Sequence, residues 1–184
     1  MMKTEEEDLL EEKATKGSGD RMKVMVGMDG SDGSIRALTW ALETLFKPGS
    51  SVAASITLLH VQEPFFYPKG PAVYMTPSAM EVVRKEQDAN SASMVTMARD
   101  LCKQKSAQVE VGSVIMVGEP KEAMCRAAEQ FRADLLVMGS HGKGMIKRAL
   151  LGSVSDYCAH HVRCPVVIVK RRKRSDVTRE SVSV

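Results

Sequence analysis

Five short apolar runs alternate with helical patterns along this chain. The alternation predicts a parallel sheet, because after each run a helix must carry the chain back before the next strand begins. Right-handed crossovers with one reversal of winding direction give an α/β fold, a doubly wound open five-stranded parallel sheet, which we expect in the strand order 3-2-1-4-5. The five runs cover residues 23–28, 55–61, 108–117, 134–138 and 165–169.

Four helical patterns lie between these runs. The first has a cap at Ser31 or Asp32 and a stop at Pro48-Gly49. A proline-rich stretch over residues 64–77 predicts a surface loop, and a long helix over about 78–105 follows it. Pro120 suits the first turn of the third helix, and the fourth covers about 153–161. The residues that we expect to be buried on the first three helices are Ile35, Leu38, Leu42, Leu45, Met94, Val95, Met97, Ala98, Leu101, Cys102, Ala123, Met124, Ala127, Ala128 and Phe131.

The two ends of the chain differ in charge from the middle. Residues 1–20 are rich in acids and predict a disordered acidic tail. Residues 172–184 predict a disordered basic tail, and the folded domain is expected over residues 21–171. The basic run Lys170–Arg174 has a second interpretation, as a nuclear-import or phosphate-binding patch.

Composition narrows the class of partner. The net charge is +3 and aromatic residues make up 4% of the chain, whereas a dedicated nucleic-acid binder carries a strong basic patch and stacking rings. Apolar runs are too short for a membrane helix, and the acidic N-terminus lacks the apolar centre of a secretion signal. We therefore expect no nucleic-acid or membrane partner and a cytoplasmic location, with nuclear entry through the basic run as the alternative.

The four cysteines form no C-x-x-C pair, so the sequence predicts neither a redox motif nor a structural zinc site. Cys158, His160, His161 and Cys164 do cluster in the sequence, and metal binding there is the less favoured interpretation. The favoured one is that Cys158 packs as a small hydrophobic residue on a helix.

The segment with the strongest chemical signal runs from Met138 to Gly144 and resumes at 151–155. It begins at the end of a predicted strand and finishes at the start of a predicted helix, where glycines allow close backbone approach and free amides face an anion. The spacing is neither that of a Walker A loop nor that of the dinucleotide fingerprint. A long structural turn is the alternative. Side chains that could assist a phosphate are Ser140, Ser153, Ser155, Lys143, Lys147 and Arg148.

Five pieces in order resemble the ATP-binding branch of the universal stress protein family, in its plant-type single-domain form. The pieces are VMVGMDGS (24–31), LLHV (58–61), VGEP (117–120), the Gly139-x-x-Gly142 to Gly152-Ser153 loop with LGSVS (151–155), and CPVVIVK (164–170). The resemblance covers about residues 21–171. It implies a Rossmann-like fold of the adenine nucleotide alpha hydrolase type.

Residue by residue, the resemblance implies a nucleotide site. Asp29 would accept a hydrogen bond from a ribose hydroxyl, which suits a group that only accepts; its alternative role is an Asx cap. Gly27, where the family often has proline or valine, and Met28 would lie on the adenine side, and Val61 and Met138 would bracket the base. The residues that would surround the phosphates are Gly139, Ser140, His141, Gly142, Gly152, Ser153, Val154 and Ser155. We assign no catalytic and no metal-binding residue, and His60 is expected to be a packed strand-end residue.

The function that we expect is a nucleotide-dependent sensor or regulator of the stress response, with ATP, ADP or AMP as ligand. Residues 140–151 would be ordered by the ligand and change a surface for a downstream partner. Magnesium is a candidate companion of the phosphates, although no carboxylate pair is evident. The alternatives are a slow ATP hydrolase or phosphate-transfer enzyme, and an interaction protein without ligand. The apolar edge strand 165–169 and the family resemblance predict a homodimer through that strand.

Overall fold

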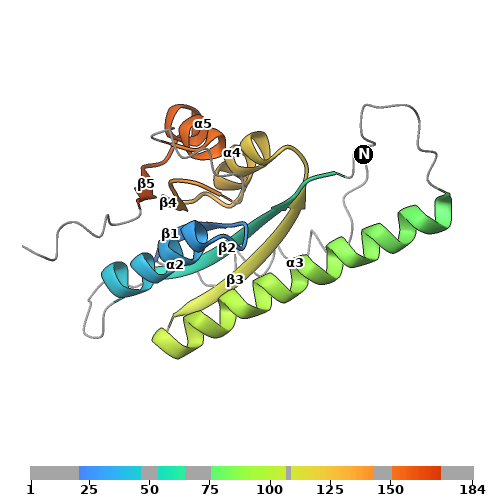
Figure 1. Ribbon diagram of the computed structural model, residues 1–184. Coiled ribbons are helices and arrows are strands. Elements are labelled where there is room, and N and C mark those ends of the chain that lie inside the picture. Colours follow the sequence, from blue (N-terminus) through green and yellow to red (C-terminus); the bar gives the residue numbers. More distant parts are fainter. Residues whose placement is uncertain (1–20, 47–53, 65–75, 107–108, 143–150, 171–184) are drawn as a thin grey trace, which may run out of the picture.

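The sheet has the predicted topology. The computed structural model (Figure 1) describes residues 21–46, 54–64, 76–106, 109–142 and 151–170. Its five strands are all parallel and follow the order β3-β2-β1-β4-β5, as expected from the alternation of apolar runs and helices. The strands are β1 (Met22–Met28), β2 (Ala54–Gln62), β3 (Glu110–Val117), β4 (Leu135–Gly139) and β5 (Val166–Val169). The helices are α2 (Asp32–Leu45), α3 (Pro77–Lys105), α4 (Pro120–Gln130) and α5 (Ser153–His161).

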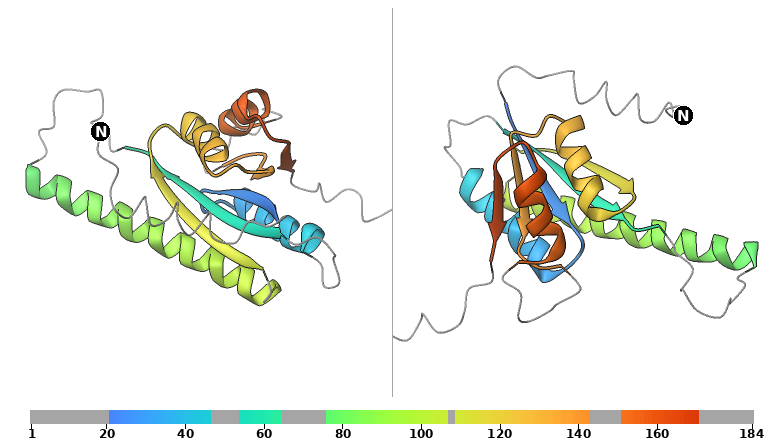
Figure 2. Two further views of the ribbon diagram at one scale, coloured as in Figure 1. Left: turned by 180° about the vertical axis from the view of Figure 1, so that it is seen from behind. Right: turned by 90° about the horizontal axis from the view of Figure 1, so that it is seen from above.

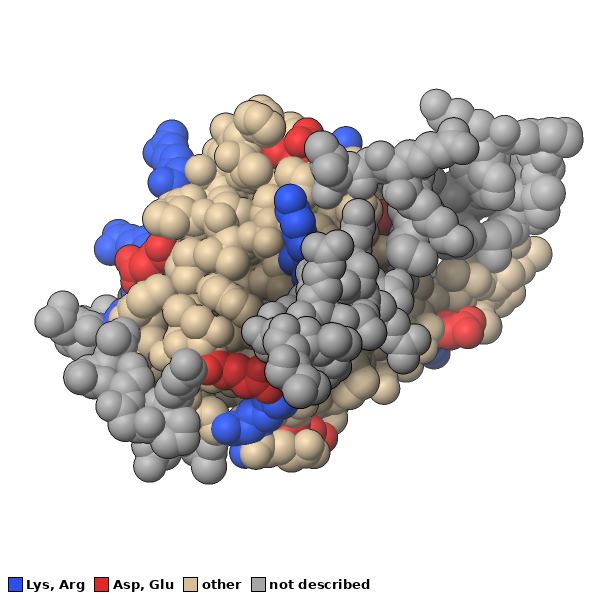
Figure 3. Space-filling model, turned by 60° about the vertical axis from the view of Figure 1, so that its left-hand side comes forward, with Lys and Arg blue, Asp and Glu red and all other residues tan. Residues whose placement is uncertain are grey.

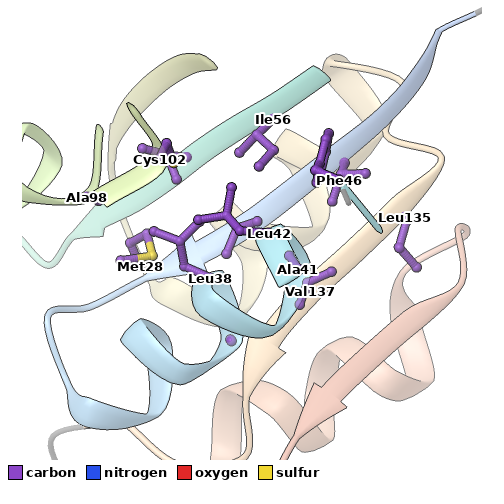
Figure 4. Packing of buried hydrophobic residues seen from close by; sticks show 14 residues of the cluster. Met28, Leu38, Ala41, Leu42, Phe46, Ile56, Ala98, Cys102, Leu135 and Val137 are labelled. Atoms are coloured by element: carbon purple, nitrogen blue, oxygen red, sulfur yellow. The ribbon is translucent and has the colours of Figure 1, made fainter. Parts of the chain in front are cut away.

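Helices cover both faces of the sheet (Figures 1 and 2). One cluster of buried residues fills the space between the sheet and α2 with α3, and part of it is seen in Figure 4. A second cluster lies between the other face and α4 with α5. β1 contributes residues to both clusters, since Val24 and Val26 belong to the first cluster and Met25 belongs to the second. This explains why the central runs are apolar throughout and do not alternate.

The helix termini follow from local sequence. Ser31 caps α2, because its hydroxyl accepts a hydrogen bond from the amide of Ser34 (3.2 Å). Pro120 opens α4 as predicted, and α5 has the predicted bounds. Among the described helices, none combines the length and the apolar character that crossing a bilayer requires.

One buried position was predicted wrongly. Met97 is 49% exposed, whereas the residues of α3 that are buried are Ser91, Val95, Ala98 and Cys102. These four recur at spacings of three and four, and Met97 lies one residue, about 100°, away from Ala98 on the helix. Most of the predicted loop 64–77, the stop at Pro48-Gly49 and both predicted tails fall outside the described residues.

Replacing Ser31 with alanine removes the cap of α2 and one hydroxyl bonded to Asp29. We expect Ser31→Ala to lower the free energy of unfolding by about 1 kcal/mol, the typical contribution of such a cap. Urea denaturation followed by circular dichroism measures the change. Ser93→Ala on the exposed side of α3 is the matched control, and equal midpoints for the two variants would contradict the assignment of the cap.

Candidate functional site

A cavity of about 550 Å³ opens at the carboxyl ends of the strands, where winding reverses between β1 and β4. Its volume lies in the range of small-molecule sites, and its position is the one at which open α/β sheets hold their ligands. Twelve of the thirteen residues that the sequence analysis placed at the nucleotide site line it. They are Gly27, Met28, Asp29, Val61, Met138, Gly139, His141, Gly142, Gly152, Ser153, Val154 and Ser155.

The amino-terminal end of α5 forms one side of the cavity. Gly152 is its cap residue, and no side chain caps the first turn. The amides of Ser153, Val154 and Ser155 have no intrahelical partner by position, and all three residues line the cavity. An anion placed there would meet both the free amides and the positive end of the helix dipole.

Ser140, the thirteenth residue, does not line the cavity. It is buried at 7% exposure, and its carbonyl accepts a hydrogen bond from the amide of Gly152 (2.7 Å). The hydroxyl of Ser155 lies 3.1 Å from the same carbonyl and 2.9 Å from that of Gly152. The carbonyl of Ser140 therefore anchors the start of α5. The hydroxyl of Ser155 donates its proton to a backbone carbonyl. This leaves the amide of Ser155 to face a ligand.

Asp29 follows β1 and lines the cavity. Its Oδ1 accepts hydrogen bonds from the amide (3.0 Å) and the hydroxyl (2.6 Å) of Ser31 and so makes an Asx turn, whereas the cap of the following helix, the alternative role considered for Asp29, is Ser31. Gly142 lies against the other oxygen, because a Cβ added to Gly142 would collide with Oδ2 of Asp29. Ser31 thus orients the carboxylate through Oδ1. Position 142 must be a glycine because Oδ2 occupies the space that a side chain would need.

Two glycines bring backbones into close contact beneath the cavity. A Cβ on Gly139 would lie 2.6 Å from the carbonyl carbon of Gly33, and a Cβ on Gly33 would collide with the carbonyl oxygen of His141. The first turn of α2 therefore packs directly on the end of β4. The sequence analysis explained Gly139 by phosphate approach alone, whereas the structure gives it a packing reason as well.

Part of the cavity wall is apolar. It consists of Val61, Met124 and Met138, together with Gly27. A Cβ on Gly27 would lie 2.6 Å from the terminal methyl of Met124, so this methyl fills the space beside the glycine. Met124 was expected only as a core residue of α4, and it is both buried and part of the cavity wall.

His60 is a hydrogen-bonded strand-end residue, as expected, and it also lines the cavity. Its Nδ1 lies 2.8 Å from the carbonyl oxygen of Met28, which can only accept, so Nδ1 carries the proton. Nε2 lies 3.2 Å from the hydroxyl of Ser91 on α3. The ring therefore joins the ends of β1 and β2 to α3.

Charge is sparse around the cavity. In the described part of the chain, no lysine or arginine lines it, and its carboxylates are those of Asp29 and Glu63. The face in Figure 3 has positive and negative side chains interspersed, without a field of one sign. Lys143, Lys147 and Arg148, which could supply positive charge, fall outside the described residues.

The cysteines are free thiols, and Cys158 is fully buried as predicted. Burial, together with a smaller effect of the neighbouring Cys125, raises the pKa of Cys158 to about 12. His160 and His161 bond the carbonyls four residues before them, and the ring of His161 stacks on that of Tyr157. Within the described ranges, no three histidine, cysteine or acidic side chains are grouped to hold a metal ion.

Sequence reasoning missed the wall that α3 contributes. Gln87, Asn90 and Ser91 recur at spacings of three and four, which places them on one helical face, and this polar face was the available signal. The residues of the cavity wall that the analysis did not assign to the site are Ser34, His60, Gln62, Glu63, Gln87, Asn90, Ser91, Pro120 and Met124.

Comparison with protein-family models finds a match between residues 21–170 and the universal stress protein family. Two curated relatives are from Arabidopsis thaliana. Universal stress protein A-like protein is 30% identical over 138 residues, which cover 74% of this chain and 77% of the relative. Universal stress protein PHOS32 is 33% identical over 172 residues, which cover 85% of this chain and 67% of the relative.

Solved structures with the same fold include three universal stress proteins. UspA from Lactobacillus plantarum superposes with a TM-score of 0.64 at 25% identity, covering 83% of this chain and 99% of that one. A family protein of Arabidopsis thaliana with AMP bound has a TM-score of 0.59 at 26% identity, covering 82% and 92%. A universal stress protein in complex with cAMP has a TM-score of 0.58 at 26% identity, covering 83% and 98%.

Proposed function

Because the chain belongs to the universal stress protein family, we propose that the cavity at the carboxyl edge of its sheet binds an adenine nucleotide, ATP, ADP or AMP. The observation that carries the proposal is the uncapped first turn of α5, which lines the same cavity as several apolar side chains and a carboxylate. The AMP and cAMP bound by two structural neighbours support this ligand class.

Each part of a nucleotide meets a suitable group. The base would lie beside Val61, Met124 and Met138, whose apolar side chains suit the two faces of its ring. The carboxylate of Asp29 would accept a hydrogen bond from a ribose hydroxyl. The phosphates would face the amides of Ser153 to Ser155 and pass close to Gly142.

Magnesium would be held mainly by the phosphates. The ion usually binds through one or two carboxylates together with phosphate oxygens and water, and needs no complete cage of protein ligands. Asp29 and Glu63 are the carboxylates that the described cavity wall offers, and Oδ1 of Asp29 already accepts two hydrogen bonds. Binding of ATP with and without magnesium measures what the ion adds.

We further propose that nucleotide binding regulates a partner and that turnover is not the function. A hydrolase needs a group that positions the attacking water, and in the described wall His60 is engaged with Met28 and Ser91. The predicted ligand-ordered segment 140–151 includes residues 143–150, which lie outside the described residues.

The experiment that tests these proposals begins with acid extraction of the purified protein and chromatography of the supernatant. Co-purified intact ATP or AMP, and saturable binding in a calorimetric titration, are expected. ADP or AMP that accumulates over many turnovers from added ATP would identify a hydrolase instead. No co-purified nucleotide and no heat of binding would contradict nucleotide binding altogether.

We also propose a homodimer through β5. Val166–Val169 is an edge strand whose outer backbone groups have no neighbour within the described sheet. We expect Val167→Lys to give a monomer by light scattering, because a charge on this strand opposes pairing. Ile115→Lys on the opposite edge strand β3 is the control and should leave the mass unchanged. A Val167→Lys protein that is folded and still dimeric would contradict pairing through β5.

A further inference from the structure

Two thiols meet where α4 packs against α5. The two helices lie next to each other on one face of the sheet (Figures 1 and 2). Cys125 of α4 and Cys158 of α5 form a hydrogen bond through their side chains. Cys158 is a fully buried member of the second cluster, and Cys125 is partly buried and packs against that cluster. The two cysteines are far apart in the sequence, so only the fold reveals the pair.

The other two cysteines have different surroundings. Cys102 lies on the opposite side of the sheet, in the first cluster of buried residues. Cys164 precedes β5, and its thiol forms a hydrogen bond with the backbone of Leu136 on β4. All four cysteines lie in the described part of the chain, and Cys125 and Cys158 are the pair whose thiols the fold holds in contact.

The two thiols of the pair differ in access and in acidity. Cys125 is partly exposed, whereas Cys158 is shielded from solvent, so a small oxidant reaches Cys125 first. Burial raises the pKa of the Cys125 thiol, and the hydrogen bond from Cys158 opposes this rise, because a donor stabilises a neighbouring thiolate. Since the thiolate is the nucleophile, Cys125 is the attacking group, and its reaction is slower than that of a thiol in water.

We propose that Cys125 and Cys158 form a redox-sensitive dithiol site, which hydrogen peroxide converts into a disulfide between α4 and α5. The thiolate of Cys125 attacks one peroxide oxygen and becomes a sulfenic acid, while the other oxygen leaves as hydroxide and takes up the proton that the thiol lost. The thiol of Cys158 then attacks the sulfenic sulfur, the S–S bond forms, and a second water leaves. Two thiols and one peroxide thus give one disulfide and two waters. A small dithiol reverses the reaction by thiol–disulfide exchange.

The disulfide would lie within one helical turn of the cavity wall. Cys125 directly follows Met124, which lines the cavity, and Cys158 comes three residues after Ser155, which lines it as well. The bond brings the two sulfur atoms to about 2 Å from each other, closer than any non-bonded contact. Oxidation therefore changes how α4 and α5 pack beside the cavity. The modification itself requires no ligand, so it is tested independently of nucleotide binding.

Counting the thiols of the full chain before and after peroxide treatment of the folded protein tests the site. Alkylation in denaturant followed by mass spectrometry should find all four thiols free before treatment, and only two after it. Dithiothreitol should restore the original count. Digestion without a reductant should yield a peptide that joins positions 125 and 158. Four free thiols after treatment, or a disulfide between a different pair, would overturn the proposal.

Three substitutions separate the roles of the cysteines. Cys125→Ser leaves the buried thiol of Cys158 without its attacking partner, so this variant should form no disulfide. Cys158→Ala leaves Cys125 without a resolving thiol, so its sulfenic acid should persist and be trapped by dimedone. Cys164→Ser is the matched control, since it removes another thiol beside the same cluster, and it should form the disulfide as wild type does. Absence of the dimedone adduct at Cys125 in folded Cys158→Ala would contradict the order of attack.

Discussion

Gly142→Val is expected to weaken binding of ATP or AMP at least tenfold, about 1.4 kcal/mol. Already the first carbon of a side chain at this position would collide with Oδ2 of Asp29. The valine would push the carboxylate away from the ribose site and narrow the path of the phosphates. Isothermal titration calorimetry with each nucleotide measures the loss.

Gly112→Val is the matched control for that substitution. Gly112 lies within β3, and a Cβ there would meet its nearest atoms at 3.9 Å, an ordinary contact distance. β-branched residues also suit a strand. We expect this variant to bind nucleotide as wild type does. Wild-type affinity in Gly142→Val, with the protein folded, would show that the segment after β4 does not approach the ligand.

Gly139→Ala is expected to lower the free energy of unfolding by about 3 kcal/mol, at the upper end of overpacking effects. The added methyl would lie 2.6 Å from the carbonyl carbon and 2.8 Å from the carbonyl oxygen of Gly33. These are backbone atoms in the first turn of α2, which cannot rotate away as a flexible side chain can. The helix must shift or the strand end must bend. Thermal and urea unfolding measure the loss of stability.

Gly27→Ala provides the comparison for this second prediction. Its methyl would also meet an atom at 2.6 Å, but that atom is the terminal methyl of Met124, which can change rotamer. We therefore expect Gly27→Ala to cost clearly less stability than Gly139→Ala. Equal losses in the two variants would mean that the close approach of α2 to β4 is not the reason for the glycine at position 139.

The fold could be predicted from the sequence because its signals are local and repeated. Each apolar run and each helical stripe indicates one element, and the handedness of crossovers leaves few topologies. The order of the strands and the bounds of α5 were therefore confirmed. The exposure of Met97 was missed, because α3 has several neighbouring apolar residues in this region. Such a pattern does not show, to within one residue, which side of the helix is buried.

The candidate site could be predicted only in part. The residues Asp29 after β1 and His141 and Gly142 after β4 are found from strand ends and glycines, and they do line the cavity. The contact between Gly33 and Gly139 and the hydrogen bonds from His60 and Gln62 to α3 join segments far apart in the sequence. No local pattern specifies such contacts. Ser140 was assigned to the ligand because a hydroxyl in a glycine-rich segment resembles a phosphate donor, whereas in the structure it is buried and does not line the cavity.

A crystal structure of the protein soaked with ATP is the most direct test of the central claim. The account predicts electron density in the cavity, with phosphate oxygens at the amides of Ser153, Val154 and Ser155 and the base beside Val61 and Met138. An empty cavity at saturating ATP, or a nucleotide bound elsewhere on the molecule, would contradict it.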